Sequence, residues 1–171
     1  MAGERDCALL TTSFSNDAGL LVLCRSLLAR LYRRHTVNIA LIAHDNKKEL
    51  MVRFCTAYAG IFAKHTLCGT SSTAAMISEE TGLHVRAFMM GEYGGSEQIG
   101  VRIAYNEIDL VICFHDPGDS DYDQAITYLS RLCDQNTVPF ATNAATAEAL
   151  VLALDRGDLD WRTIVNPVMK M

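Results

Sequence analysis

The run Val37-Asn38-Ile39-Ala40-Leu41-Ile42-Ala43 decides the fold, because it reads as a buried strand and stops abruptly at His44-Asp45. Four later runs have the same form: 65–69 before Thr70, 84–90 before Gly91, 108–114 before His115-Asp116 and 137–141 before Thr142-Asn143. Ligands of open α/β sheets bind outside the carboxyl ends of parallel strands. We therefore expect these five polar strand ends to share one pocket.

Amphipathic segments separate the five runs. Their apolar spacing predicts helices at about 47–62, 72–81, 96–105, 122–134 and 144–155. Strands that alternate with helices across short loops indicate an α/β domain whose parallel sheet is doubly wound, here with about five strands. Residues 163–165 are a candidate for one further short strand.

The segment before the first strand reads differently. We expect residues 1–16 to be flexible and residues 17–35 to form an N-terminal helix with leucines on one face. Residues 36–171 then make up the α/β domain. The helix is expected to pack on this domain or on another subunit, with association at a membrane surface as the alternative.

Composition narrows the function classes. The 171 residues suit one domain, and the net charge of −5 without a large basic cluster argues against nucleic-acid binding. No membrane span or signal peptide is apparent, so we expect a cytoplasmic protein. Six cysteines without a CxxC pair are expected to be reduced and mostly buried thiols.

The strongest chemical signal is Gly69-Thr70-Ser71-Ser72-Thr73, where a strand ends, hydroxyl side chains follow and a helix begins. Free N–H groups and the positive end of a helix dipole suit a phosphate, and the hydroxyls can donate to its other oxygens. The motif is not the triphosphate-binding P-loop. The alternative is that Ser71 or Ser72 merely caps the helix.

Two further strand ends carry charged groups. Lys48 is placed to give an anion its point charge, and His44 to polarise a carbonyl. The alternative is that Asp45 or Asn46 simply caps the helix. After the glycine loop at Gly91, Glu97 is a candidate general base if it is buried beside the site, or else an acid in the first turn of a helix.

Asp116 follows the fourth strand and is a candidate for orienting a base or binding a substrate hydroxyl. Asp119, Asp121 and Asp123 lie nearby and raise the question of a divalent metal. The rest of a calcium-binding loop is missing, so we expect no metal.

In this order, the motifs NIALIAHDNKK, GTSSTAAMISEETG, MGEYGGSEQIG, IDLVICFHDP and VPFATNAATA resemble the methylglyoxal synthase family. The resemblance runs from about Val37 to Ala149. It implies a compact α/β domain that often assembles into homo-hexamers, a small phosphorylated ligand and no cofactor. In the family's enzymes, dihydroxyacetone phosphate loses a proton to a carboxylate, and the enediolate then eliminates phosphate to give methylglyoxal.

The resemblance carries site roles to eight matching positions, which are His44, Asp45, Lys48, Thr70, Ser72, Thr73, Gly91 and Asp116. It implies that His44 polarises substrate oxygens and that the lysine, the hydroxyl residues and the glycine hold phosphate. The family's catalytic base is the aspartate after the double glycine, and that position is Ser96 here.

Two functions are therefore expected. The first is a methylglyoxal synthase-like lyase in which Glu97 or Asp45 replaces the usual base. The second is a non-catalytic sensor that binds a small phosphorylated metabolite and acts on a partner.

Overall fold

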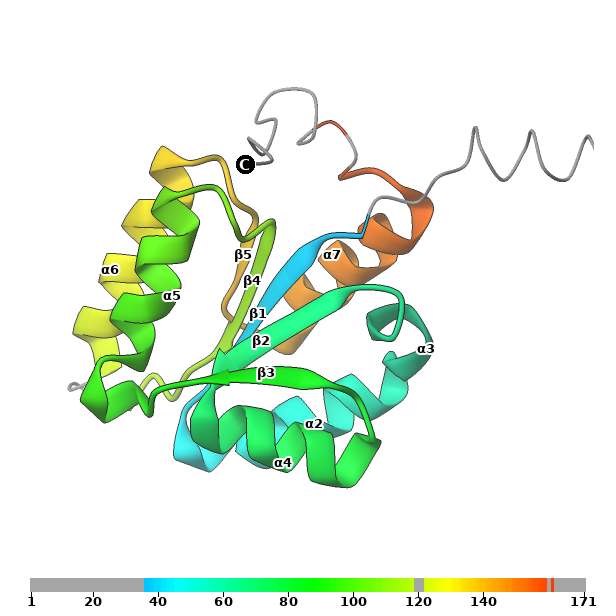
Figure 1. Ribbon diagram of the computed structural model, residues 1–171, viewed down its shortest axis with the longest axis horizontal. Coiled ribbons are helices and arrows are strands. Elements are labelled where there is room, and N and C mark those ends of the chain that lie inside the picture. Colours follow the sequence, from blue (N-terminus) through cyan, green and yellow to red (C-terminus); the bar gives the residue numbers. More distant parts are fainter. Residues whose placement is uncertain (1–35, 119–121, 160, 162–171) are drawn as a thin grey trace, which may run out of the picture. The chain divides into compact units, whose positions relative to one another are not determined.

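Five parallel strands form a single sheet in the computed structural model, which describes residues 36–118, 122–159 and Trp161. The strand order is β3-β2-β1-β4-β5 (Figure 1). The strands are β1 (Asn38–Ala43), β2 (Thr66–Thr70), β3 (Val85–Phe88), β4 (Leu110–Phe114) and β5 (Phe140–Ala141). The expected N-terminal helix and the candidate strand at 163–165 lie outside the described residues.

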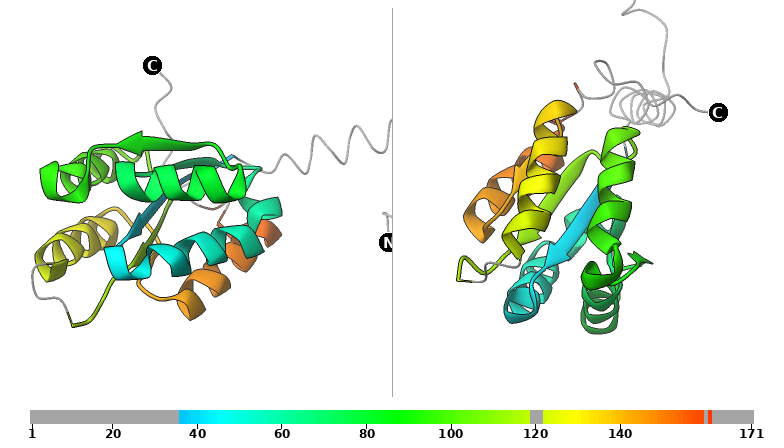
Figure 2. Two further views of the ribbon diagram at one scale, coloured as in Figure 1. Left: turned by 90° about the horizontal axis from the view of Figure 1, so that it is seen from below. Right: turned by 90° about the vertical axis from the view of Figure 1, so that its left-hand side faces the viewer.

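Helices cover both faces of this sheet (Figure 2). They are α2 (Lys48–Ala57), α3 (Ala59–Phe62), α4 (Ser71–Thr81), α5 (Gly95–Ala104), α6 (Tyr122–Gln135) and α7 (Ala144–Arg156), with short 3₁₀ turns η1 (Asp45–Lys47) and η2 (Gly91–Tyr93). α5 and α6 lie on one face, and α2, α4 and α7 lie on the other (Figures 1 and 2). The prediction of a doubly wound parallel α/β sheet with five strands is confirmed.

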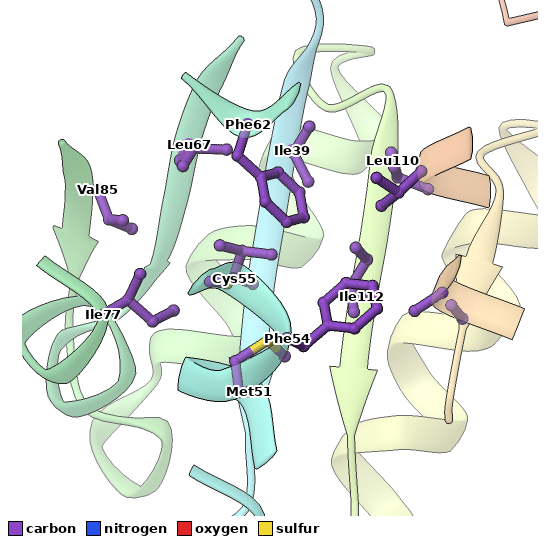
Figure 3. Packing of buried hydrophobic residues seen from close by; sticks show 14 of the residues in the cluster. Ile39, Met51, Phe54, Cys55, Phe62, Leu67, Ile77, Val85, Leu110 and Ile112 are labelled. Carbon is purple, nitrogen blue, oxygen red and sulfur yellow. The ribbon is translucent and has the colours of Figure 1, made fainter. Parts of the chain in front are cut away.

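The core lies on the two faces of β1 and β4, the central strands. Every residue of β4 is buried, as are all but the first of β1. On the face covered by α2, the ring of Phe54 packs edge-on against Phe62 and Phe114, with centroids 6.1 and 5.5 Å apart. Figure 3 shows the rings of Phe54 and Phe62 among aliphatic side chains that include Ile39 and Ile112. The strands that end in the polar clusters are therefore anchored in the most buried part of the molecule.

Several expected elements have other bounds in the structure, among them the strands expected at 84–90 and 108–114, which are shorter, and two further differences have a local cause. The helix predicted over 47–62 breaks at Tyr58, whose hydroxyl donates to Glu148 Oε1 at 2.7 Å and which separates α2 from α3. The expected last strand, 137–141, shortens to two residues. Pro139 has no N–H to donate to a neighbouring strand, although its carbonyl accepts from Val111 N at 3.0 Å.

Four of the six cysteines lie in the described part of the chain, and all four are buried thiols outside any disulfide, as predicted. Burial raises the pKa of the Cys55 and Cys113 thiols to about 12 and that of Cys68 to about 11. Cys7 and Cys24 lie outside the described residues. In that same part of the chain, no helix has the length and apolar character needed to cross a membrane.

Candidate active site

The candidate site begins where the chain switches from one side of β1 to the other. β2 pairs with one edge of β1 and β4 with the opposite edge. The backbone N–H of His44 donates to the carbonyl of Phe114 at 2.9 Å, so the two strands remain joined just beyond β1. In doubly wound sheets, ligands bind in the crevice outside such a switch point. The polar residues after β1 and β4 therefore leave the sheet at the place where a ligand is expected.

Lys48 and Asp45 form the charged pair of this site. The Lys48 ammonium lies 2.6 Å from Asp45 Oδ1, and its side chain is only 16% exposed, whereas that of Asp45 is 80% exposed. The hydrogen bond and the positive charge of Lys48 lower the pKa of the Asp45 carboxyl below its ordinary value. The lysine is thus the fixed member of the pair, and the carboxylate faces solvent.

His44 sets the geometry of the turn after β1. It is the N-cap of η1, and its Nδ1 accepts from the backbone N–H of Asn46 at 3.4 Å. A neutral imidazole that accepts at Nδ1 carries its proton on Nε2. The alternative in which Asp45 or Asn46 caps the following helix is wrong, because the N-cap of α2 is Lys47.

Two buried threonine hydroxyls lie at the end of β2 and in the first turn of α4. Thr70 Oγ1 donates to Thr73 Oγ1 at 3.1 Å, and Thr73 Oγ1 donates to the carbonyl of Ala43 at 3.5 Å. Both residues are at least 97% buried. These bonds tie the first turn of α4 to the end of β1, and so bring the hydroxyl cluster to the end of the strand that carries His44.

The start of α4 has the character of an anion site. Its N-cap is Thr70, and no side chain makes a capping hydrogen bond there. Ser71 and Ser72 lie inside the first turn, so the alternative in which either serine is the cap is wrong. The N–H groups of an uncapped first turn and the positive end of the helix dipole favour a negatively charged ligand.

The glycine loop closes against this helix start. Ser71 N donates to the carbonyl of Met89 at 3.4 Å, which places the entrance of the loop beside α4. A Cβ on Gly95 would lie 2.2 Å from that same carbonyl oxygen, so only glycine allows α5 to begin this close to the chain. Gly91 opens the 3₁₀ turn of the loop, between Met89 and the double glycine.

Ser96 and Glu97 have opposite surroundings. Ser96 is only 5% exposed in the first turn of α5, whereas Glu97 is exposed. Glu97 Oε2 lies 3.8 Å from the position that a Cβ would take on Gly94, so the carboxylate bends back over the loop. The prediction of Glu97 as a base requires burial beside the site, and the structure does not meet that requirement.

Asp116 joins the site through a residue that the sequence did not single out for this role. The side-chain amide of Asn46 donates to Asp116 Oδ2 at 3.2 Å, linking the turn after β1 to the loop after β4. The backbone N–H of Gly118 and the Asn46 amide hold the pKa of the Asp116 carboxyl below its ordinary value. In the sequence, the only signal for this contact was that Asn46 is a polar residue next to the predicted site residue Asp45.

Within the described ranges, no three His, Cys, Asp or Glu side chains gather closely enough to hold a metal ion. Asp119 and Asp121 lie outside those ranges, and the side chain of Asp123 is not described.

The fold and the strand-end cluster together define a doubly wound α/β domain with an anion-suited site at its switch point. Residues 50–142 match the family described as MGS-like domain. The chain belongs to the methylglyoxal synthase family.

Named relatives support this membership. A methylglyoxal synthase of Caldicellulosiruptor saccharolyticus is 55% identical over 135 residues, which cover 78% of this chain and 96% of the relative. One of Geobacillus thermodenitrificans is 53% identical over 131 residues, or 76% and 91% of the two chains. The structure of a methylglyoxal synthase from Elizabethkingia anophelis superposes with a TM-score of 0.61 at 40% identity, covering 68% of this chain and 77% of that one.

Proposed function

We propose that this protein is a carbon–oxygen lyase that converts dihydroxyacetone phosphate into methylglyoxal and phosphate. The observation that supports the proposal is the tie from Thr73 at the start of α4 to Ala43 at the end of β1, the strand that leads to Lys48, in a chain about half identical to proteins named methylglyoxal synthase. A cation, hydroxyls and an uncapped helix start are the groups that hold a phosphate monoester.

The chain's own residues divide the reaction between them. Lys48, the hydroxyl residues Thr70, Ser72 and Thr73, and the backbones of α4 and Gly91 hold the phosphate. The His44 Nε2 proton is directed at the substrate's carbonyl oxygen. A carboxylate removes a proton from the hydroxymethyl carbon, and the C–H electrons form the enediolate. The enediolate then breaks the C–O bond to phosphate, which leaves with the bonding pair. The resulting enol gains a proton on carbon to become methylglyoxal.

Asp45 is the better supported of the two proposed bases. In the unliganded protein its negative charge is held by Lys48, which lowers its pKa and its strength as a base. A phosphate dianion that shares the Lys48 ammonium would weaken that hold and raise the pKa of Asp45. Substrate binding would therefore bring the carboxylate closer to the pKa at which a general base works best. Glu97 is exposed as well, and the ion pair that Lys48 makes among the described residues is with Asp45.

A sensor function is the second candidate, and Ser96 is the observation that favours it. A serine at the position of the family's base cannot accept a proton from carbon at neutral pH, and the remaining site would then bind a phosphorylated metabolite without turning it over. The buried threonines and Lys48 serve either function equally.

The deciding experiment is incubation of the protein with dihydroxyacetone phosphate in heavy water. Deuterium uptake into substrate and release of methylglyoxal are followed together by NMR. The lyase proposal expects both signals, with uptake lost in Asp45→Asn and kept in Glu97→Gln. Loss in Glu97→Gln alone would move the base to Glu97. Phosphate binding with neither signal in the wild type would establish the sensor.

Phosphate binding itself needs a separate check. Lys48→Ala and Thr70→Ala are each expected to weaken phosphate binding at least tenfold in calorimetry, whereas Lys64→Ala, which removes a half-exposed lysine paired with Asp155, is expected to leave it unchanged. Equal affinity in all three variants would refute the proposed phosphate site.

We also propose a homo-oligomer, with a hexamer as the family resemblance implies, in which residues 17–35 pack at a subunit contact. Light scattering on the full chain and on a chain without residues 1–35 would test this. The proposal expects the assembly mass divided by the mass of one chain, which is the number of subunits, to change. An unchanged number of subunits would contradict it.

A further inference from the structure

A cleft separate from the candidate active site lies between the edge strand β3 and the helix α5. Its volume is about 720 Å³, and residues of β3 and α5 supply most of its lining. β3 stands at the end of the strand order, and no described strand pairs with its outer side (Figure 1). An unpaired edge strand offers its backbone N–H and C=O groups to another chain. None of the residues proposed to bind or convert substrate lines this cleft.

Exposed apolar side chains gather beside the cleft. Among the described residues, every large apolar side chain that is at least 50% exposed lies between residues 89 and 105. Three of them, Met89, Val101 and Tyr105, line the cleft. Clustered apolar surface of this kind is typical of sites that bind another molecule, such as a protein. The cleft therefore combines an open strand edge with apolar surface that a bound chain would cover.

The charges of the cleft favour an acidic occupant. The guanidinium groups of Arg86 and Arg102 lie 5.7 and 4.6 Å from the centre of the Phe88 ring, so two cations share one aromatic ring. Arg102 Nη1 donates to Glu107 Oε2 at 2.7 Å. Arg86 forms no ion pair with any described residue, and Glu107 is the only carboxylate among the described residues that line the cleft. One positive charge is therefore left without a counterion.

A second copy of this chain is the less suitable occupant. If two β3 strands paired about a twofold axis, each residue of this short strand would lie near its own counterpart in the other copy. Arg86 would then lie near another Arg86, and like charges opposite each other in a sheet are destabilising. A partner that brings carboxylates avoids this repulsion and supplies the missing counterion.

We propose that this cleft is a docking site for an acidic, extended segment of a partner protein, which adds a strand to the sheet beside β3. Successive side chains of a strand point to opposite faces, so Arg86 and Phe88 share one face of β3 and line the cleft together. Alternate residues of the segment then point into the cleft, with a carboxylate beside Arg86 and an apolar side chain beside Val101 and Tyr105. The site is independent of the proposed lyase activity, because none of its residues belongs to that machinery.

The test measures binding of a fluorescein-labelled peptide, Thr-Glu-Thr-Leu-Thr-Glu-Thr, to the full chain by fluorescence anisotropy. The proposal expects saturable binding, and at least tenfold weaker binding of a control peptide in which both glutamates are glutamines. A second control peptide, with the same side chains but methylated backbone nitrogens, is also expected to bind at least tenfold more weakly, because it cannot donate hydrogen bonds to β3. No binding of the first peptide, or equal binding of either control peptide, would overturn the proposal.

Two matched variants test whether the peptide binds at this edge. Arg86→Glu reverses a charge in the cleft and is expected to weaken binding of the first peptide at least tenfold. Arg53→Glu makes the same change on α2, where the side chain is 80% exposed, and is expected to leave binding unchanged. Light scattering should give both variants the assembly mass of the wild type. An equal effect of the two variants on binding would refute the proposal. A smaller assembly for Arg86→Glu alone would also refute it, by identifying a second copy as the occupant.

Discussion

Single residues decide what the site can do, and sequence alone predicts them unevenly. Thr70 and Thr73 are recognisable from their place after a buried strand, but their bond to each other and to the Ala43 carbonyl depends on how β2 pairs with β1. Glu97 shows the opposite case. Its position beside the glycine loop is plain in the sequence, whereas its exposure follows from the direction in which α5 leaves the loop.

Ser96→Asp should raise the rate of proton abstraction from dihydroxyacetone phosphate by about 10²-fold, the lower end of what general base catalysis contributes. The position is buried, and it lies in the first turn of α5, where the helix dipole favours a carboxylate. Deuterium uptake in heavy water measures the rate, and Ser130→Asp in α6 is the control. A rate equal to that of the control would mean that position 96 does not face the substrate.

The Asp45–Lys48 pair should add to stability only above a certain pH. Lys48 lowers the pKa of the folded Asp45 below its ordinary value of 3.8, so the pair stabilises the fold at higher pH, and this contribution is lost as the pH falls through that value and below. Urea unfolding of the wild type and Asp45→Asn should therefore differ slightly at pH 6 and converge near pH 2. The effect is small because the carboxylate is largely exposed. A gap that widens in acid would contradict the assignment.

At the scale of elements, the alternation of apolar and amphipathic segments predicts the strands and helices well, because it reflects burial. It does not contain the strand order β3-β2-β1-β4-β5, which depends on contacts far apart in the chain. The break at Tyr58 escaped prediction for the same reason, since the hydrogen bond from its hydroxyl reaches Glu148 on α7. Local pattern thus fixes the pieces, and long-range packing fixes where they end.

Gly69→Ala should destabilise the protein by about 1–3 kcal/mol, the usual cost of forcing extra volume into a packed interior. A Cβ at this position would lie 2.4 Å from the carbonyl oxygen of Leu41 on β1, so β2 would have to move away. Gly60→Ala in α3 is the control, because its Cβ would meet nothing within 4 Å. Urea unfolding measures both. Equal stability of the two variants would show that the strands can separate without cost.

For the whole molecule, the sequence correctly predicts a doubly wound sheet whose polar residues collect at one edge. Charge and the pattern of apolar residues are enough for this prediction, because they indicate which surfaces are buried away from water. They do not reveal how the residues beside His115 line a pocket together with Lys47 and Thr142, because that lining comes from three separate segments of the chain. The assembly of subunits likewise depends on which surfaces fit each other, and the sequence pattern alone does not predict that fit.

The buried thiols should be inert as long as the fold holds. At pH 8, a thiol with a pKa of about 12, as for Cys55, is four pH units from half ionisation, so only about one molecule in 10⁴ carries the thiolate. A variant with Cys7→Ser and Cys24→Ser isolates the four described cysteines. It should react with a coloured disulfide reagent within seconds in urea and only over hours in its absence. Rapid reaction of the folded variant would place a thiol at the surface.

The candidate site lies beyond the ends of β1 and β4, and the bond from His44 to Phe114 is the last rung of that ladder. Both strands run through the centre of the sheet, so we expect the residues beyond them to keep their places only while the core is folded. On heating, each molecule would therefore be either folded with a complete ligand-binding site or unfolded with none. Loss of activity and loss of folded structure would then follow the same curve against temperature, with no population that is folded but only partly able to bind ligand.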